Sequence, residues 1–308
     1  MSAATKSPLI SNKPSPADSV LSLTTFYLVA PCLIFLLCWV QPWIGIPTTA
    51  LLLLGILSFL RTLPTSPINV KLQMTDYWFA IGLALVWTFL SGVGGFVPQE
   101  TDYIKHNLLF NDLVHRPWPV TYPQTPSGEG GYLCYGLGYY LVPSAATRLL
   151  GENTLPWLSY IWASFGLSLF FIWIIRLTSA RKRGLLFFLF FAPSGILLLT
   201  LKWHGIPGVI NPDSFSKTLW KLGLIHSYLD NFTKLQFQPQ HGIVAGLGTV
   251  VLFELLWQRQ SAKGVVLIWS ACLFWSPLTC IGMLLIPLAS FRRIDWRGYF
   301  NLSNFYPA

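Results

Sequence analysis

Long apolar stretches with almost no charge follow one another along most of this sequence. A helix needs about 20 mostly apolar residues to cross roughly 30 Å of hydrocarbon. Only 10% of the residues are charged, whereas a soluble domain carries about 25%, so too few charges exist to cover a water-facing surface. Because lipid requires complete backbone hydrogen bonding, we predict an all-α fold, a polytopic transmembrane helix bundle of about seven to nine spans.

The apolar stretches predict the order of these spans within a single transmembrane domain, residues 19–308. Residues 1–18 are rich in Ser, Pro and Lys, cannot bury enough apolar surface to order themselves, and are expected to form a disordered cytoplasmic tail. The last stretch is long enough for a broken span or for a tight hairpin about Trp275-Ser276-Pro277. The stretches lie at about residues 20–40, 43–60, 77–95, 155–177, 185–203, 241–258 and 265–291.

The formal net charge of +9 comes from Lys and Arg residues in short clusters between the apolar stretches. This arrangement is typical of orientation signals, in which positive charge stays cytoplasmic, and it does not favour nucleic acid as a partner. We therefore expect an integral, multi-pass membrane protein with a cytoplasmic N-terminus. Two polar loops, about residues 96–154 and 204–240, then lie on the non-cytoplasmic side.

The segment 132–150 inside the first loop is apolar enough to be another span. If it crossed the membrane, the basic cluster of Arg176, Arg181 and Arg183 would lie outside, against the positive-inside tendency. The sequence therefore predicts interfacial helices in the first external loop, with tyrosines at the level of the headgroups.

The densest polar cluster, Pro98 to Asn107, directly follows the third apolar stretch. Proline followed by acidic residues is typical of a helix start, and Asp102 and His106, four residues apart, would share one face of that helix. A carboxylate and an imidazole can perform general acid/base chemistry. Glu100 and Asp102 could also hold a divalent cation, Mg²⁺ or Mn²⁺, against phosphate oxygens. The alternative is that these acids only complement the helix dipole.

Further features follow the acidic cluster in a particular order: Trp118-Pro119, a tyrosine-rich segment at 135–143, and Arg148-Leu149-Leu150-Gly151. This order resembles the first external loop of the GT-C superfamily of membrane glycosyltransferases, which includes the protein O-mannosyltransferases and the aminoarabinose transferases. The resemblance covers about residues 92–177. It departs from the family pattern where Tyr135-Gly136-Leu137 replaces the usual Pro-Pro-Leu.

The resemblance implies transfer of a sugar from a polyprenyl-phosphate-linked donor to an unknown acceptor, at the non-cytoplasmic face of the lipid bilayer. It implies that Asp102 is the catalytic base or a metal contact, with Glu100 as its partner. Pro239 with Gln240 and His241 after it also suits a helix N-terminus, where anions bind readily. Each candidate for phosphate contact could equally face headgroups or anchor a helix end in water; the candidates are Lys105, His106, His115, Arg116, His204, Lys234, Gln240 and His241.

Two other classes of function stay open. A lipid or small-solute transporter, or a flippase-like protein, would carry polar residues or broken helices near the bilayer midplane, whereas this chain keeps nearly all its charge in loops. A noncatalytic membrane subunit is the third class. Glu254 is the clear acidic residue inside a span, and snorkelling or pairing with Arg259 explains it more simply than ion transport.

Overall fold

The computed structural model describes residues 16–64, 66, 70, 72–99, 102–123, 128, 130–178, 238–290 and 294. The predicted tail up to residue 15, the predicted span at 185–203 and the second polar loop up to residue 237 lie outside these residues. The described part is mainly helical, with one two-stranded sheet. The first helix already begins at Pro16, slightly before the predicted end of the tail.

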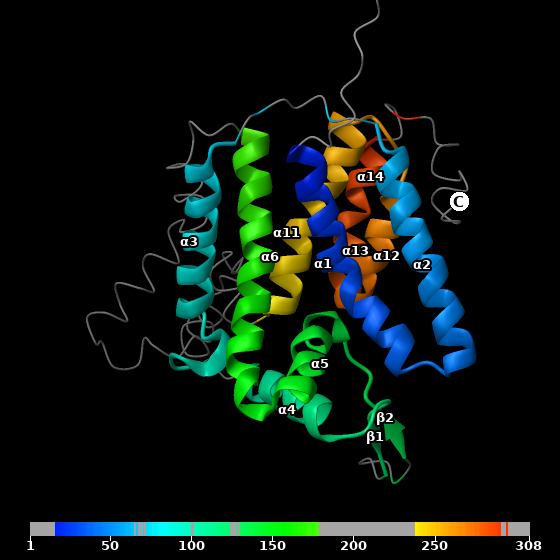
Figure 1. Cartoon of the computed structure of the whole chain (residues 1–308), viewed down its shortest axis with the longest axis vertical. Coiled ribbons are helices and arrows are strands. Elements are labelled where there is room, and N and C mark those ends of the chain that lie inside the picture. The colour runs from blue at the N-terminus through cyan, green and yellow to red at the C-terminus, as the bar shows by residue number, and fades with distance from the viewer. Residues whose placement is uncertain are drawn as a thin grey trace, which may run out of the picture.

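Long helices run side by side along the vertical direction of Figure 1. Within the described residues, four segments are long and apolar enough to cross a membrane: Ser19–Cys38, Pro42–Thr62, Glu152–Thr178 and Pro239–Gln258. This finding agrees with the predicted helical membrane class, although it does not establish seven to nine spans. The long helices are α1 (Pro16–Cys38), α2 (Pro42–Thr62), α3 (Met74–Leu90), α6 (Leu155–Thr178) and α11 (Pro239–Phe253), which a π-helical turn, η5 (Glu254–Gln258), extends.

The helices are apolar on their outer faces as well as inside the bundle. Leu51, Leu54 and Leu57 of α2 are exposed, while Tyr27 and Trp173 are among the largest fully buried side chains. A helix that is apolar all round is typical of a membrane span or of a large buried core. In a bundle of this size, exposed leucines on a 21-residue helix indicate a lipid-facing surface.

The last described helices form a hairpin rather than one continuous span. α12 (Val265–Trp275) is followed by α13 (Pro277–Met283) and α14 (Leu285–Ser290). The Trp269 indole donates to the Cys280 carbonyl at 3.0 Å, yet eleven residues of continuous helix would separate them by about 16 Å. The chain therefore reverses at Ser276, so the hairpin, one of the two predicted alternatives, is present.

The first polar loop lies across the lower end of the bundle in Figure 1, which we call the loop end. α5 has only 10 residues, far fewer than a crossing needs, which agrees with the prediction that 132–150 is not a transmembrane span. The elements of this end are η1 (Val93–Gly95), α4 (Asp102–His115), β1 (Thr121–Tyr122), β2 (Gly131–Tyr132), η2 (Leu137–Tyr139), α5 (Leu141–Leu150) and η3 (Glu152–Thr154).

Two glycines let the loop approach the tip of the hairpin. A Cβ atom on Gly136 would lie 2.4 Å from the Trp275 carbonyl oxygen, and one on Gly138 would lie 2.5 Å from the Trp275 indole. Trp275 is fully buried and donates from its indole to the Leu28 carbonyl of α1 at 2.9 Å. The hairpin tip is therefore enclosed between α1 and the polar loop.

A buried ionic cluster lies toward the other end of the bundle. Glu254 Oε1 accepts from Arg259 Nε at 3.1 Å and from Arg176 Nη2 at 3.3 Å. All three side chains are almost completely buried. The predicted pairing of Glu254 with Arg259 is confirmed, and Arg176 is an additional partner from α6.

Candidate functional site

Asp102 and Lys105 lie together on the water-accessible side of α4. Asp102 begins the helix, and its Oδ2 atom lies 3.9 Å from Lys105 Nζ. The two side chains remain 38% and 44% exposed respectively. An exposed pair of this kind contributes little to stability, so both groups are available to a ligand.

His106 points the other way, into the protein. Its side chain is buried, and its Nδ1 atom shares a 2.5 Å hydrogen bond with the Tyr140 hydroxyl. Tyr140 directly precedes α5, so this contact fixes α4 on the second half of the polar loop. Within the part of the chain described here, Asp102 therefore pairs with Lys105, while the predicted partner His106 holds the helix in place.

Tyr135 connects α4 with the first turn of α11. Lys105 Nζ lies 5.8 Å from the centre of the Tyr135 ring, and Gln240 Nε2 donates to the Tyr135 hydroxyl at 3.3 Å. Lys105 is also within electrostatic reach of His241. The structure thus brings together residues predicted from two distant polar segments. We call Asp102, Lys105, Tyr135, Gln240 and His241 the loop-end cluster.

Gln240 and His241 have different hydrogen-bond partners and therefore different roles in the cluster. Gln240 is fully buried, so its contact with Tyr135 positions that ring. His241 is half-buried and its Nδ1 lies 2.6 Å from Ser276 Oγ, which donates to Thr279 Oγ1. This contact occupies Nδ1 of the imidazole, so Nε2 is the ring nitrogen that remains for a ligand.

The first turn of α11 offers few backbone donors to an anion. Pro239 has no N–H, and the amides of His241 and Gly242 already donate to the Gln238 carbonyl at 3.0 and 3.1 Å. Helix N-termini bind anions through unsatisfied amides, so little of that effect remains here. Lys105 is consequently the group in the cluster that best suits a phosphate.

His115 and Arg116 lie at the far end of α4, about 20 Å from Asp102 by helix rise. His115 Nε2 contacts Glu152 Oε1 at 2.9 Å, and Arg116 Nε contacts Asp112 Oδ1 at 2.9 Å. The structure therefore does not bring these two candidates to the loop-end cluster. Three other predicted residues, Glu100, His204 and Lys234, lie outside the described residues.

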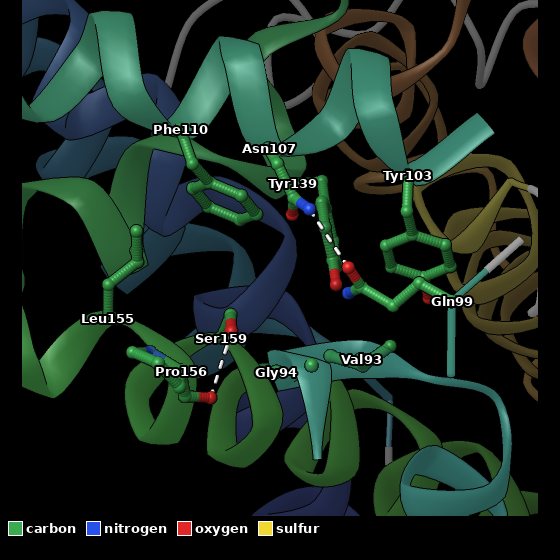
Figure 2. A pocket seen from close by; sticks show the side chains of 11 residues that line it. Val93, Gly94, Gln99, Tyr103, Asn107, Phe110, Tyr139, Leu155, Pro156 and Ser159 are labelled. Carbon is green, nitrogen blue, oxygen red and sulfur yellow. Dashed lines mark hydrogen bonds between the residues drawn. The ribbon is translucent and has the colours of Figure 1, made fainter. Parts of the chain in front are cut away.

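A second feature of the loop end is a cavity of about 230 Å³ between α4, η1 and the start of α6 (Figure 2). Tyr103, Asn107 and Phe110 reach into it from α4, and Ser159 faces it from α6. Asp102 does not line this cavity, although its neighbour Tyr103 does. Sequence reasoning missed these residues, and only the run Gly92-Val93-Gly94-Gly95 indicated an unusual backbone here.

Burial controls the ionisation of the tyrosines around the cavity and the cluster. Burial raises the pKa of Tyr103 well above its usual value, Tyr139 raises it further, and Ser91 opposes the change. Burial likewise raises the pKa of Tyr139 and of Tyr140. All three phenols are therefore protonated at physiological pH and can donate hydrogen bonds.

The described residues bear on the predicted cation site only through Asp102, because Glu100 is not among them. Among them, no group of three or more His, Cys, Asp or Glu side chains gathers at one place. Asp102, the predicted metal contact inside the described part, lies beside the Lys105 ammonium group.

Comparisons with protein-family models, with curated proteins and with solved structures give no match.

Proposed function

We propose that this chain is a membrane glycosyltransferase of GT-C type that takes a sugar from a polyprenyl-phosphate-linked donor at its loop end. The observation that carries the proposal is the loop-end cluster, in which the exposed Asp102 carboxylate lies 3.9 Å from the exposed Lys105 ammonium. Burial and the charge of Lys105 both lower the pKa of His241, the imidazole that α11 contributes to this cluster. The apolar outer faces of the helices suit a donor with a lipid tail. The order of motifs in the polar loop supports the same class.

In the proposed reaction, Asp102 accepts the proton of the acceptor hydroxyl. The acceptor oxygen then forms a bond to the anomeric carbon of the sugar, while the bond from that carbon to the phosphate oxygen breaks. The phosphate leaves with the bonding electrons and gains negative charge, which the Lys105 ammonium stabilises. His241 is a second candidate for proton transfer within the cluster, because burial and Lys105 lower its pKa and so favour the neutral imidazole.

Transfer of labelled sugar in reconstituted membranes tests this proposal. Asp102→Asn keeps the shape of the side chain but removes the base, so we expect transfer to fall by at least about 100-fold, the usual contribution of general base catalysis. Glu152→Gln, the same chemical change at a loop-end carboxylate whose side chain is 71% exposed, is the control and should retain activity. Equal activity of Asp102→Asn and the wild type would remove Asp102 from the mechanism.

One observation favours the alternative of a transporter. The hairpin of α12 and α13 is a broken helical element, and transporters often build their binding sites from such elements. Uptake of lipid or solute into vesicles by a wild-type protein that transfers no sugar would support this alternative. Sugar transfer that depends on Asp102 would exclude it as the main function.

A further inference from the structure

The cavity beside α4 is lined by residues other than those of the loop-end cluster (Figure 2). Its volume of about 230 Å³ is slightly below the roughly 300–1,000 Å³ of most small-molecule pockets. It therefore has room for one ring-sized ligand. Prominent among the lining side chains are Gln99, Tyr103, Asn107, Phe110, Tyr139 and Ser159.

Gly94 allows the cavity wall to form. Its φ angle is +86°, and a Cβ atom there would lie 2.7 Å from the Pro156 carbonyl oxygen. Any other residue would be strained in this backbone conformation and would also push η1 away from α6. The wall thus depends on the close approach of two segments that are far apart in the sequence.

One buried polar group in the wall has no hydrogen-bond partner of good geometry among the described residues. The Tyr103 side chain is only 4% exposed, and its hydroxyl makes no hydrogen bond to the described residues. Ser91, which influences its pKa, instead donates to the Thr88 carbonyl. A buried hydroxyl without a partner is unfavourable, so Tyr103 is suited to donate to an atom that occupies the cavity.

Two amide side chains add further polar groups to the wall. Gln99 Nε2 donates to the Gly92 carbonyl at 2.8 Å, and Gln99 Oε1 accepts from Asn107 Nδ2 at 2.9 Å. Because an asparagine amide has two N–H donors and an acceptor oxygen, Asn107 retains a donor and an acceptor beyond this contact. The wall therefore offers both kinds of hydrogen-bonding group, held in place by Gln99.

Among the residues that the structure describes, those that line the cavity include no Lys, Arg, His, Asp or Glu. A charged ligand without an opposite charge nearby would lose much of its hydration energy on entering. The rings of Phe110 and Tyr139 provide apolar surface beside the polar groups. We propose that this cavity binds a single uncharged ring that carries hydroxyl groups, such as one sugar unit, with Tyr103 donating to a ligand oxygen. This site goes beyond the proposed transfer reaction and can exist without it.

Photoaffinity labelling of the full chain in phosphatidylcholine nanodiscs tests the site. The probes are a diazirine-bearing methyl hexoside and the same hexose on polyprenyl phosphate, and competition uses the unlabelled hexoside and the matching uronic acid. We expect labelling of α4 or α6, displaced by the neutral hexoside but not by the uronic acid. If only the polyprenyl form labels, the ring arrives on a lipid; if both forms label, the cavity accepts the free sugar.

Three variants make the test specific. Tyr103→Phe removes one hydrogen bond and should weaken binding about 3- to 10-fold, while Ser159→Leu fills the cavity and should abolish labelling. Tyr160→Phe is the control. Tyr160 lies next to Ser159 on α6, and its hydroxyl donates to the Leu85 carbonyl, so this variant should bind the probe as the wild type does. Thermal unfolding checks that each variant is folded. If Ser159→Leu does not fold, the comparison of Tyr103→Phe with Tyr160→Phe alone decides whether the probe binds in the cavity.

The proposal is overturned if the wild type is not labelled, if Tyr103→Phe binds like Tyr160→Phe, or if the uronic acid competes as well as the neutral ring. Asp102→Asn separates this site from the proposed reaction, because that variant should bind the probe normally while losing transfer. Binding by a wild type that never transfers sugar would refute the reaction and leave the site intact.

Discussion

Glu254 Oε1 lies 3.3 Å from Arg176 Nη2, although 78 residues separate the two along the chain. The same oxygen accepts from Arg259, so one buried carboxylate joins α6 to the π-helical end of α11. Removal of the carboxylate charge would leave two buried guanidinium groups facing a neutral side chain, and such uncompensated charge is costly.

Glu254→Gln should therefore lower the free energy of unfolding by about 3–5 kcal/mol. Thermal or denaturant unfolding in detergent measures the change. Glu152→Gln is the matched control, because its side chain is 71% exposed and exposed sites usually change stability by less than about 0.5 kcal/mol. If both variants unfolded alike, the ionic cluster would have no structural importance.

Gly136→Ala should loosen the contact between the polar loop and the hairpin. The new Cβ atom would lie 2.4 Å from the Trp275 carbonyl oxygen, which is backbone and cannot rotate away. We expect a loss of about 1–3 kcal/mol in stability, as overpacking usually costs. Gly82→Ala is the control, since a Cβ there meets nothing within 4 Å and alanine favours helix. A Gly136→Ala variant as stable as Gly82→Ala would contradict the docking of the loop on Trp275.

The two ends of the bundle should be labelled from opposite sides of the membrane. Lys263 Nζ lies 3.4 Å from the Thr62 carbonyl, whereas His115 is at the loop end. In a background without the exposed Cys38 and Cys134, Lys263→Cys should react with an impermeant maleimide from the cytoplasmic side and His115→Cys from the other. Reaction of both from one side would contradict the predicted topology.

Tyr122 provides a test of the loop end at alkaline pH. Burial, together with the hydrogen bond to Asp112 and its charge, raises the pKa of Tyr122 to about 12, while Arg116 opposes the change. The 2.5 Å bond to Asp112 needs the protonated phenol, so its stabilisation is complete below the ordinary pKa of about 10. It should be lost as the pH rises from about 10 to 12.

The difference between the absorbance titration curves of the wild type and of Tyr122→Phe follows the ionisation of this phenol directly. Asp112→Asn should move the midpoint downward from about 12, although not to the ordinary value, because burial remains the largest cause. A midpoint unchanged by Asp112→Asn would show that the carboxylate does not act on Tyr122.

The long helices were predictable because apolar length decides which segments can span a membrane. The argument from charge parity that residues 132–150 do not cross agrees with the 10-residue length of α5. The pairing of Glu254 with Arg259 followed from nearness in sequence, whereas Arg176 could not be found because its partner is 78 residues away.

The direction in which His106 points could not be predicted either, since spacing places a residue on a helix face without saying which face is buried. The cavity depends on positive φ angles at Gly92, Gly94 and Gly95 and on contact with Pro156, and no periodic pattern predicts such contacts.

Binding of polyprenyl phosphate without its sugar tests whether the loop-end cluster recognises a lipid phosphate. Native mass spectrometry of the protein in nanodiscs should show binding to the wild type and roughly tenfold weaker binding to Lys105→Gln, since charge-assisted hydrogen bonds are worth about 1.5–3 kcal/mol before exposure reduces them. Lys263→Gln, at the other end of the bundle, should bind as the wild type does. Equal affinity of Lys105→Gln and the wild type would contradict the assignment of the phosphate to this cluster and, with it, the donor proposed for the enzyme.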